Sequence, residues 1–466
     1  MPQNFLSADR EQSFLLPPDP REWLPEEHLA WFVIDAVGVM DLSGFYGAYR
    51  ADGHGRAAYE PSVVVALLLY CWSRGVRSSR RIERACVEDV ACRVIAAHQQ
   101  PDHATIARFV ERHERALAGL FGEVLWLCAG AGLVSVGVLA VDGTKVAASA
   151  NRDRTMDYEQ IAREIVEQQI QTDRAETAEH GERRGDELPE EIKTGEGRRK
   201  YLAAARQRLE RERAARAAPV PRSRAKRLVD AKARLEEELA VEQRANDEYE
   251  AYRQRDRDKT GRGLGAPPKP YRPPGQPAGK VNLTDPDSRL VHGMRGWLQG
   301  YNVQAACNEQ HVIVAAEVMT SSPDFGNLGP MVAAAKRELA AAGITDTPGL
   351  VVADAGYWHL EQMNEITAAG TPVLIPPDAG RRKDIRPGWN GGAYAFMRHV
   401  LNTETGRALY KRRAALIEPI FGDTKHNRGF TRFARRGRSA ARTEWRLIAT
   451  THNLLKLHQH FNTLPA

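Results

Sequence analysis

Residues 136–145 read VGVLAVDGTK, in which a short run of apolar, β-prone residues leads directly into an acid, Asp142. The run from Val136 to Val141 is wholly apolar and contains three valines. Such a run is typical of a strand that is buried on both faces of a sheet. A second stretch of the same kind, GLVVADAGYW at 349–358, leads into Asp354. We therefore predict two buried strands, each with an aspartate at its carboxyl end.

The segments around these two strands alternate between strand and helix patterns. A hairpin is predicted from Tyr301–Cys307 and His311–Val318, which a turn at Asn308-Glu309 joins. Further patterns predict strands at 350–353 and 372–375, and helices at 328–342, 358–369, 408–425 and 443–461. A hairpin followed by βαβ units predicts an α/β fold, with a mixed sheet and flanking helices. Sites in open α/β sheets gather at the carboxyl ends of strands, where both aspartates are expected.

The first 130 residues are predicted to form an all-α N-terminal domain, 1–130. Pro61–Ser73 reads as an apolar helix, and Asp102 is a fair N-cap for the helix that begins in PDHATIARF. Arg108 and Arg112 fall four residues apart on its outer face. A short basic helix, a turn and a capped basic helix would suit a helix-turn-helix DNA reader. Outward arginines on an amphipathic helix are as often simply solvated, so both interpretations stay open.

A charged segment separates the two aspartate strands. From 156 to 257 the chain is dense in Glu, Arg, Gln and Ala, with apolar residues at helical spacing, such as Leu202/Leu209 and Leu228/Leu235. This pattern predicts exposed helices, paired as a hairpin or coiled coil. Residues 258–280 are rich in Pro and Gly and read as an extended linker. The α/β core is therefore predicted to combine 131–155 with 281–466, interrupted by the charged helical insert at 156–257.

Length and composition narrow the classes of protein. The chain has 466 residues, of which 42% are hydrophobic, which is ample for a large core. Its five cysteines include no CxxC pair and read as buried thiols in a reducing compartment. No N-terminal apolar run follows a basic start, and no apolar stretch spans a bilayer. We expect a cytoplasmic protein with no membrane partner.

Positive charge is concentrated in one segment. From Glu404 to Arg446 there are twelve Lys/Arg and four Asp/Glu, so this stretch carries +8 and the rest of the +6 chain sums to −2. Aromatic residues, among them Tyr410 and Phe433, are interleaved with these charges. A polyanionic partner fits this pattern better than a solvated basic tail does.

A third notable acid, Glu418, lies inside that segment, in YKRRAALIEPIFGDTKHNRGF at 410–430. Lys411, Glu418 and Lys425 repeat every seven residues and would share a helix face. Pro419, however, removes a backbone donor and disfavours helix at Glu418. We therefore predict a kink, or a new helix with Pro419 in its first turn.

Together, Asp142, Asp354 and Glu418 suggest a pair of divalent cations. Two-metal phosphoryl chemistry needs carboxylates that converge on ions about 3.5–4 Å apart. Each acid also has a plainer interpretation: Asp142-Gly143 as a turn, Asp354 as a helix cap, and Glu418 as a surface ion pair. Asp285, in the Pro-containing stretch NLTDPDSRLV, is read as turn chemistry.

The chain resembles the DDE transposases of bacterial insertion sequences, a family with an RNase H-like catalytic core. The stretches that carry the resemblance are PDHATIARF, LAVDGTKVAA, NLTDPDSRL, QGYNVQAA, VVADAGYW and IEPIFGDTKHNRGF. The group numbered eleven eighty-two is the most similar. The resemblance implies that Asp142, Asp354 and Glu418 are the catalytic triad and hold two Mg²⁺ or Mn²⁺ ions.

The resemblance also implies DNA contacts and partners. Related transposases carry a Tyr-x2-Arg-x3-Glu-x6-Lys signature, which Tyr410, Arg413, Glu418 and Lys425 match except for one extra residue after Arg413. Further candidate DNA contacts are Lys411, Arg412 and Arg428. The implied protein acts as a homodimer on double-stranded DNA at the bacterial nucleoid, where it cuts transposon ends and joins them to target DNA. An RNase H-like nuclease without strand transfer and a non-catalytic DNA-binding protein are the alternatives.

Tyr357 and Trp358 follow the second aspartate directly. They would suit stacking on an unpaired base at a cut DNA end. Core packing beneath the following helix is the competing interpretation, and it is the one the sequence favours.

Overall fold

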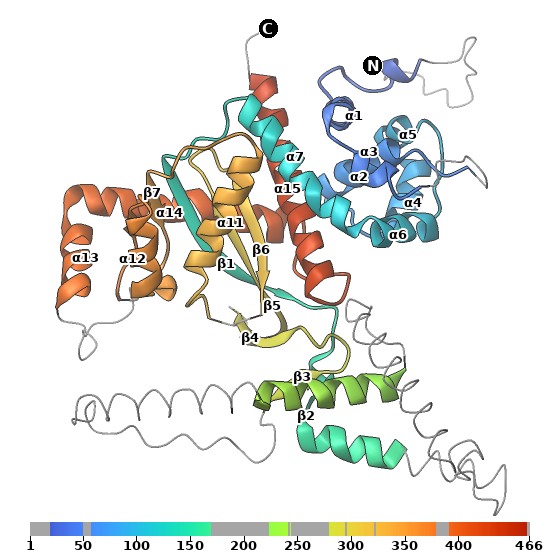
Figure 1. Ribbon diagram of the computed structural model, residues 1–466. Helices are drawn as coiled ribbons and strands as arrows, with labels where there is room; N and C mark the ends of the chain where they lie inside the picture. Colours follow the sequence, from blue (N-terminus) through green and yellow to red (C-terminus); the bar gives the residue numbers. More distant parts are fainter. Residues whose placement is uncertain are drawn as a thin grey trace, which may run out of the picture.

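The structure is a computed structural model, and it describes residues 19–49, 57–168, 223–240, 243, 279–293, 296–320, 323–378 and 391–463. A group of helices from the first part of the chain lies beside a mixed sheet, and further helices flank that sheet (Figure 1). No described helix is long and apolar enough to cross a membrane.

The chain begins with helices. After a short 3₁₀ turn, η1 (Pro20–Glu22), come α1 (Leu29–Val39), α2 (Ser43–Tyr46), α3 (Pro61–Ser73), α4 (Ser79–Glu88), α5 (Val90–Ile95), α6 (His103–Arg112) and α7 (Glu114–Gly130). The predicted apolar helix is α3, and Asp102 caps α6 by accepting a hydrogen bond from the backbone N–H of Thr105 at 2.6 Å. The extra helix α5 separates α4 from α6, so the predicted helix–turn–helix succession is not what the chain forms.

The central sheet has the order β4-β5-β1-β7-β8, and β6 also pairs with β5. Its strands are β1 (Val138–Ala147), β4 (Arg289–Gly293), β5 (Gly296–Cys307), β6 (Ile313–Met319), β7 (Leu350–Val352) and β8 (Val373–Leu374). β5 runs antiparallel to β1, whereas β7 and β8 run parallel to it. The predicted hairpin is formed by β5 and β6, which pair antiparallel. The predicted α/β class with a mixed sheet is therefore confirmed.

Further helices accompany the sheet in the second half of the chain. They are α11 (Leu328–Ala341), α12 (Leu360–Ala368), α13 (Gly392–Asn402), α14 (Glu404–Gly422) and α15 (Arg438–Thr463), with η4 (Ala355–Tyr357) after β7 and the π-turn η5 (Asp423–Asn427) after α14. One hydrophobic cluster joins the N-terminal helices, the sheet and these helices. All five cysteines are free and buried, as their apolar settings predict.

Two sequence expectations about local structure are wrong. β1 does not end at Asp142 but continues to Ala147, because β5 pairs with it over that whole length. α14 runs through Pro419 to Gly422, so no new helix starts at Glu418. The irregularity that Pro419 was expected to cause appears one turn later, as η5.

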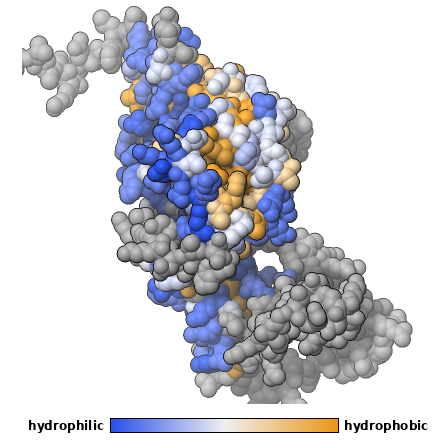
Figure 2. All heavy atoms as spheres, turned by 90° about the vertical axis from the view of Figure 1, so that its left-hand side faces the viewer, coloured by the Kyte–Doolittle hydropathy of each residue, from blue (hydrophilic) through white to orange (hydrophobic). Residues whose placement is uncertain are grey.

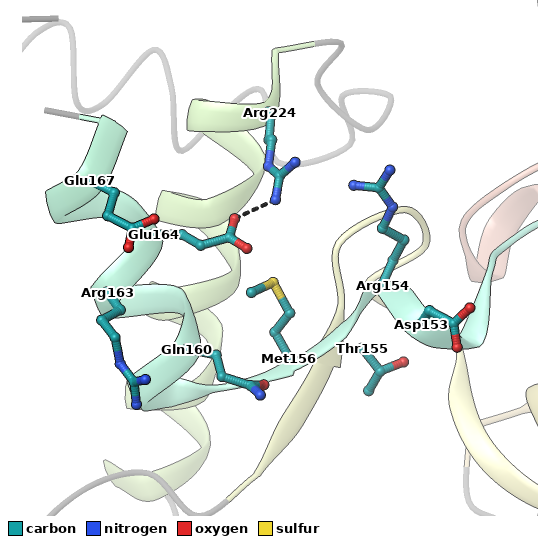
Figure 3. A pocket seen from close by; sticks show the side chains of 9 residues that line it. All are labelled: Asp153, Arg154, Thr155, Met156, Gln160, Arg163, Glu164, Glu167 and Arg224. Atoms are coloured by element: carbon teal, nitrogen blue, oxygen red, sulfur yellow. Dashed lines mark hydrogen bonds and ion pairs between the residues drawn. The ribbon is translucent and has the colours of Figure 1, made fainter. Parts of the chain in front are cut away.

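The charged segment begins and ends on a two-stranded ribbon. The short 3₁₀ turn η2 (Arg152–Arg154) leads into β2 (Thr155–Asp157), which pairs antiparallel with β3 (Lys280–Asn282), and helices at 158–168 and 224–240 pack on this ribbon. A second, separate hydrophobic cluster holds them: Ile161, Leu228, Ala231, Leu235, Val281 and Leu283. In Figure 3 the two helices lie side by side, and Arg224 pairs with Glu164. The helices predicted around Leu202/Leu209 and most of the predicted linker lie outside the described residues.

Candidate functional site

The register of the sheet brings the two aspartates to the same level. In the parallel pair β1–β7, Ala140 lies opposite Val352. Asp142 and Asp354 each follow two residues later, and neighbouring strands lie about 5 Å apart. The two carboxylates therefore come from adjacent strands at one edge of the parallel pairing, as the sequence predicts for strand-borne acids.

The Asp142 carboxylate is largely buried, with 17% of its side chain exposed. Its Oδ1 accepts a hydrogen bond from the Gly143 N–H at 2.7 Å, and its Oδ2 accepts one from Arg413 Nη1 at 2.9 Å. Burial raises the pKa of Asp142 to about 6; Arg413 opposes the rise and Asp354 adds to it. Asp142 is thus an acid whose ionised form needs a cationic neighbour.

Asp354 caps η4, and its Oδ1 accepts a hydrogen bond from the Gly356 N–H at 2.8 Å. Capping was the plainer interpretation of this residue, and the structure shows that Asp354 does cap. Burial raises its pKa, as does the nearby carboxylate of Asp324, while Arg413 and Lys145 lower it. The capping bond uses one carboxylate oxygen, Oδ1.

Arg413 connects the aspartates to the third acid. Its Nη2 lies 3.7 Å from Oε1 of Glu418, while its Nη1 binds Asp142. The Tyr410 ring lies beneath this guanidinium, 5.9 Å from its central carbon. The extra residue after Arg413 therefore does not remove it from the site. Glu418 itself is 62% exposed, so the surface ion pair that was its plainer interpretation is what the structure shows.

Lys425 lies against β1 on the Asp142 face. Its Nζ donates hydrogen bonds to the Thr144 hydroxyl and, at 3.0 Å, to the carbonyl of Lys145. Burial lowers the pKa of Lys425, and the charge of Lys145 lowers it further. The π-turn η5 supplies this lysine, so the irregular end of α14 positions a cation two residues along β1 from Asp142.

A fourth carboxylate, Asp324, was missed by the sequence reasoning. Its Oδ1 accepts hydrogen bonds from Asn302 Nδ2 and Gln304 Nε2, both at 2.8 Å, and from Lys145 Nζ at 3.2 Å. Both amide side chains are fully buried on β5. Asp324 lies in the loop before α11, where no strand or helix pattern marks it. A signal was present in QGYNVQAA, because two polar residues at alternate positions of a buried strand require a partner.

Gly143 is required by this network. A Cβ at position 143 would lie 2.8 Å from Asp324 Oδ1 and closer still to Gln304 Nε2. Gly143 pairs with Gln304 inside the β1–β5 ladder, so the turn interpretation of Asp142-Gly143 is wrong. Glycine stands here because polar side chains pass directly beneath the strand.

The predicted DNA contacts fall in different settings. Lys411 and Arg412 are exposed on α14, although Arg412 pairs with Glu309. Arg108 and Arg112 are exposed on α6, and Arg112 lies 4.6 Å over the Tyr49 ring and bonds the Ala48 carbonyl.

Arg428 was predicted to contact DNA, and this prediction is wrong because its side chain is buried. Its guanidinium donates to the carbonyls of Trp72 and Ile448, both at 3.2 Å, and to Thr451. Burial lowers its pKa to about 10. Arg428 ties three segments of the interior together and is not available to DNA.

Tyr357 and Trp358 are also buried, which favours core packing over base stacking. The Tyr357 hydroxyl donates to Gln304, and the Trp358 ring stacks on Tyr394 with centroids 5.1 Å apart.

Asp285 is also fully buried. Its Oδ1 accepts a hydrogen bond from the Tyr301 hydroxyl at 2.7 Å and another from the Gly437 N–H at 3.2 Å. It joins the turn before β4 to the start of α15.

The donor set suits a hard divalent cation, since it consists of carboxylate oxygens on two adjacent strands. Within the described ranges, no group of three or more His, Cys, Asp or Glu side chains is arranged to hold a metal ion. The geometry gives a reason: the Arg413 guanidinium lies between Asp142 and Glu418 and neutralises them. The aspartates fit a cation, and Glu418 stands apart from them across Arg413.

Comparison with known families gives two matches. A transposase domain (DUF772) matches residues 18–112, and a transposase DDE domain matches residues 377–458. The second match contains Glu418 and Lys425, whereas Asp142 and Asp354 precede it. Neither the curated proteins nor the solved structures yield a significant match. Residues 18–112 are therefore similar to a transposase domain, and residues 377–458 are similar to the DDE domain of transposases.

Proposed function

We propose that the protein cuts DNA at the ends of an insertion sequence and joins the freed 3′-hydroxyl to target DNA, using divalent metal ions. The group numbered eleven eighty-two is the proposed relative. The observation that carries the proposal is the pair Asp142 and Asp354, level on two adjacent parallel strands beneath Arg413 and Glu418. The sheet order β4-β5-β1-β7-β8, with β6 also on β5, supports an RNase H-like core. In it β5 is antiparallel to β1, β4 and β6, whereas β7 and β8 are parallel to β1.

In this proposal Asp142 and Asp354 hold Mg²⁺ or Mn²⁺, with Glu418 as the third ligand. Such ions activate the attacking oxygen and stabilise the leaving one. Arg413 favours the ionised form of both aspartates, and the Tyr410 ring lies beside its guanidinium. Lys425, fixed to β1 beside Asp142, is placed to bind a phosphate of the DNA near the cut.

DNA contacts outside the site are assigned to exposed cations. Lys411 and Arg412 extend the basic surface along α14, and Arg108 and Arg112 present a basic face on α6. The proposed organisation has an N-terminal DNA-binding part, a catalytic core in two pieces and an insert. These contacts would be to phosphates, which fix position and carry no sequence information.

A homodimer is proposed because two transposon ends must be processed together. The side of the molecule that carries α13 shows hydrophobic surface among hydrophilic residues (Figure 2). Phe396 of α13 is 64% exposed, and exposed apolar surface marks interaction sites when it is contiguous. The proposed location is the bacterial cytoplasm, at the nucleoid.

The test incubates the purified protein with Mg²⁺ and DNA that carries the inverted repeats flanking its gene. We expect nicks at the repeat boundary and joined products. Asp354→Asn should abolish both while leaving DNA binding intact. Asp346→Asn, an exposed acid in the loop before β7, is the matched control and should cut normally.

Three results would change the proposal. Nicking without joined products would favour a nuclease without strand transfer. Binding without metal-dependent cleavage would leave only a DNA-binding protein. Cleavage undiminished in Asp354→Asn would refute the site.

A further inference from the structure

A basic hollow lies beyond the end of β1, apart from the carboxylates. It measures about 620 Å³, and its lining includes Arg152, Arg154, Arg432, Arg436 and Trp297. All four arginines are exposed. Within the part of the chain that the structure describes, none of them forms an ion pair with a carboxylate; Arg436 donates only to the Ser149 carbonyl, at 3.1 Å. Among the residues that the structure describes, no carboxylate therefore pairs with the positive charge of the hollow.

Two chain segments run side by side from the carboxylates to this hollow. Where Lys425 bonds Thr144, the C-terminal segment lies against β1 close to Asp142. Seven residues later, Arg432 forms a parallel bridge with Ala147, the last residue of β1. The bridge is closed by hydrogen bonds from Ala147 N to Thr431 O at 3.1 Å and from Phe433 N to Ala147 O at 2.8 Å. The hollow is thus fixed rigidly relative to the site.

The separation matches a short length of DNA. Five residues separate Asp142 from Ala147, and a strand rises about 3.3 Å per residue, which gives about 16 Å. DNA advances about 3.4 Å per nucleotide along one strand, so this span corresponds to about five nucleotides.

An aromatic residue in the lining of the hollow, Trp297, also suits DNA as the ligand. Trp297 is 57% exposed, and its ring is held edge-on by His292 with centroids 5.2 Å apart. An exposed indole beside arginines offers a flat apolar face for a base or deoxyribose, while the guanidiniums bind phosphates.

The neighbouring hollow in the insert lacks this character. Its lining holds three arginines and three acids, which are Arg154, Arg163, Arg224, Asp153, Glu164 and Glu167 (Figure 3). Arg224 pairs with Glu164, and Arg163 lies 3.7 Å from Glu159. The charges of this second lining balance in number, whereas the lining of the hollow beside β1 contains arginines and no carboxylate.

We propose that the hollow bounded by η2, Trp297 and the Arg432–Arg436 segment binds the DNA backbone about five nucleotides from the phosphate that is cut. The proposal rests on the proposed function, because it assigns the path of the DNA that the carboxylates cleave. It adds contacts that lie outside the signature residues of α14 and η5.

The test measures equilibrium binding of the full-length protein to fluorescent repeat-end DNA in EDTA, across a series of salt concentrations. Each lost phosphate contact lowers the slope of log K against log salt by about 0.9. The double variant Arg152→Gln/Arg432→Gln should lower the slope by about two. Trp297→Ala should weaken binding about tenfold with the slope unchanged. Arg337→Gln, an exposed arginine on α11, is the control and should change neither quantity.

A second measurement locates the contact. Replacing the phosphate about five nucleotides from the cut by a neutral methylphosphonate should weaken wild-type binding and leave the double variant unaffected. Equal weakening of both proteins, or an unchanged slope in the double variant, would overturn the inference. If the inference about the hollow is overturned but the wild-type protein still cuts DNA in Mg²⁺, the proposed function stands without that inference. Wild-type protein that neither binds nor cuts would overturn both.

Discussion

At the residue scale, the most unusual group is the Asp142 carboxyl, whose pKa burial raises to about 6 from an ordinary 3.8. Between pH 3.8 and about pH 6, the Asp142 carboxyl is therefore more fully protonated in the folded state than in the unfolded state. Its ionised form costs stability above pH 6, by at most about 3 kcal/mol, and the cost vanishes as the pH falls toward 4.

Asp142→Asn should therefore stabilise the metal-free protein at pH 8, and this advantage should shrink toward pH 4.5. Thermal unfolding at both pH values measures it, with Asp346→Asn as the exposed control. Mn²⁺ should raise the melting temperature of the wild type and not that of Asp142→Asn. An advantage of equal size at both pH values would contradict the assigned pKa.

Asp324 is the second residue with a testable role. Asp324→Ala removes the acceptor for the buried amides of Asn302 and Gln304, and each unsatisfied buried donor costs about 1–3 kcal/mol. We expect a loss of at least about 2 kcal/mol in the free energy of unfolding. Asp324→Asn keeps an acceptor and should recover most of that loss. Denaturant unfolding measures both, and equal losses in the two variants would show that charge, not hydrogen bonding, is what matters.

At the element scale, α14 carries an internal proline that the sequence marks correctly as a disturbance but places wrongly. Helix propensity and packing against β1 and β5 continue the helix past Pro419, because Leu416, Ile417 and Ile420 are buried around it. Local rules govern single turns, whereas this outcome depends on tertiary burial.

Pro419→Ala should raise the free energy of unfolding by about 2 kcal/mol. Restoring the backbone donor and removing the ring clash gains about 3 kcal/mol, and the greater freedom of the unfolded chain takes back about 1 kcal/mol. Denaturant unfolding gives the value. Pro348→Ala, in the loop before β7, is a control with no helical context and should not stabilise. A loss of stability in Pro419→Ala would mean that the π-turn η5, and with it Lys425, depends on the proline.

Much of the fold followed from periodicity. The strands that lead to Asp142 and Asp354, the hairpin of β5 and β6, and α11 were all predictable, because each has a strong local pattern. Asp324 and the Arg432–Arg436 hollow were not, because their neighbours come from segments far apart in sequence. The burial of Arg428 was not predictable for the same reason, because a basic residue within a basic run gives no local sign of being buried.

At the scale of the whole molecule, α7 belongs with the sheet rather than with the helices before it. Its buried side chains, including Leu117, Phe121 and Val124, form one cluster with α15. Arg446 of α15 donates to the Ala118 carbonyl at 2.8 Å and lies 4.7 Å over the Phe121 ring. A boundary at residue 130 therefore cuts through packed structure.

A fragment of residues 114–466 should accordingly be more soluble and more stable than one of residues 131–466. Removing α7 exposes the apolar face of α15, and such faces aggregate. Gel filtration and thermal unfolding of the two fragments make the comparison. Equal behaviour would contradict the assignment of α7 to the sheet.

Gly143 has a consequence for how this chain diverges over generations. Because a side chain there would strike Asp324 and Gln304, position 143 cannot drift by itself. Related genes that keep Asp324 with Asn302 and Gln304 should keep glycine after the first aspartate. A gene that has lost this glycine should have changed its partners on β5 as well. Correlated substitutions of this kind among related genes would be evidence for the hydrogen-bond network that is independent of measurements on the purified protein.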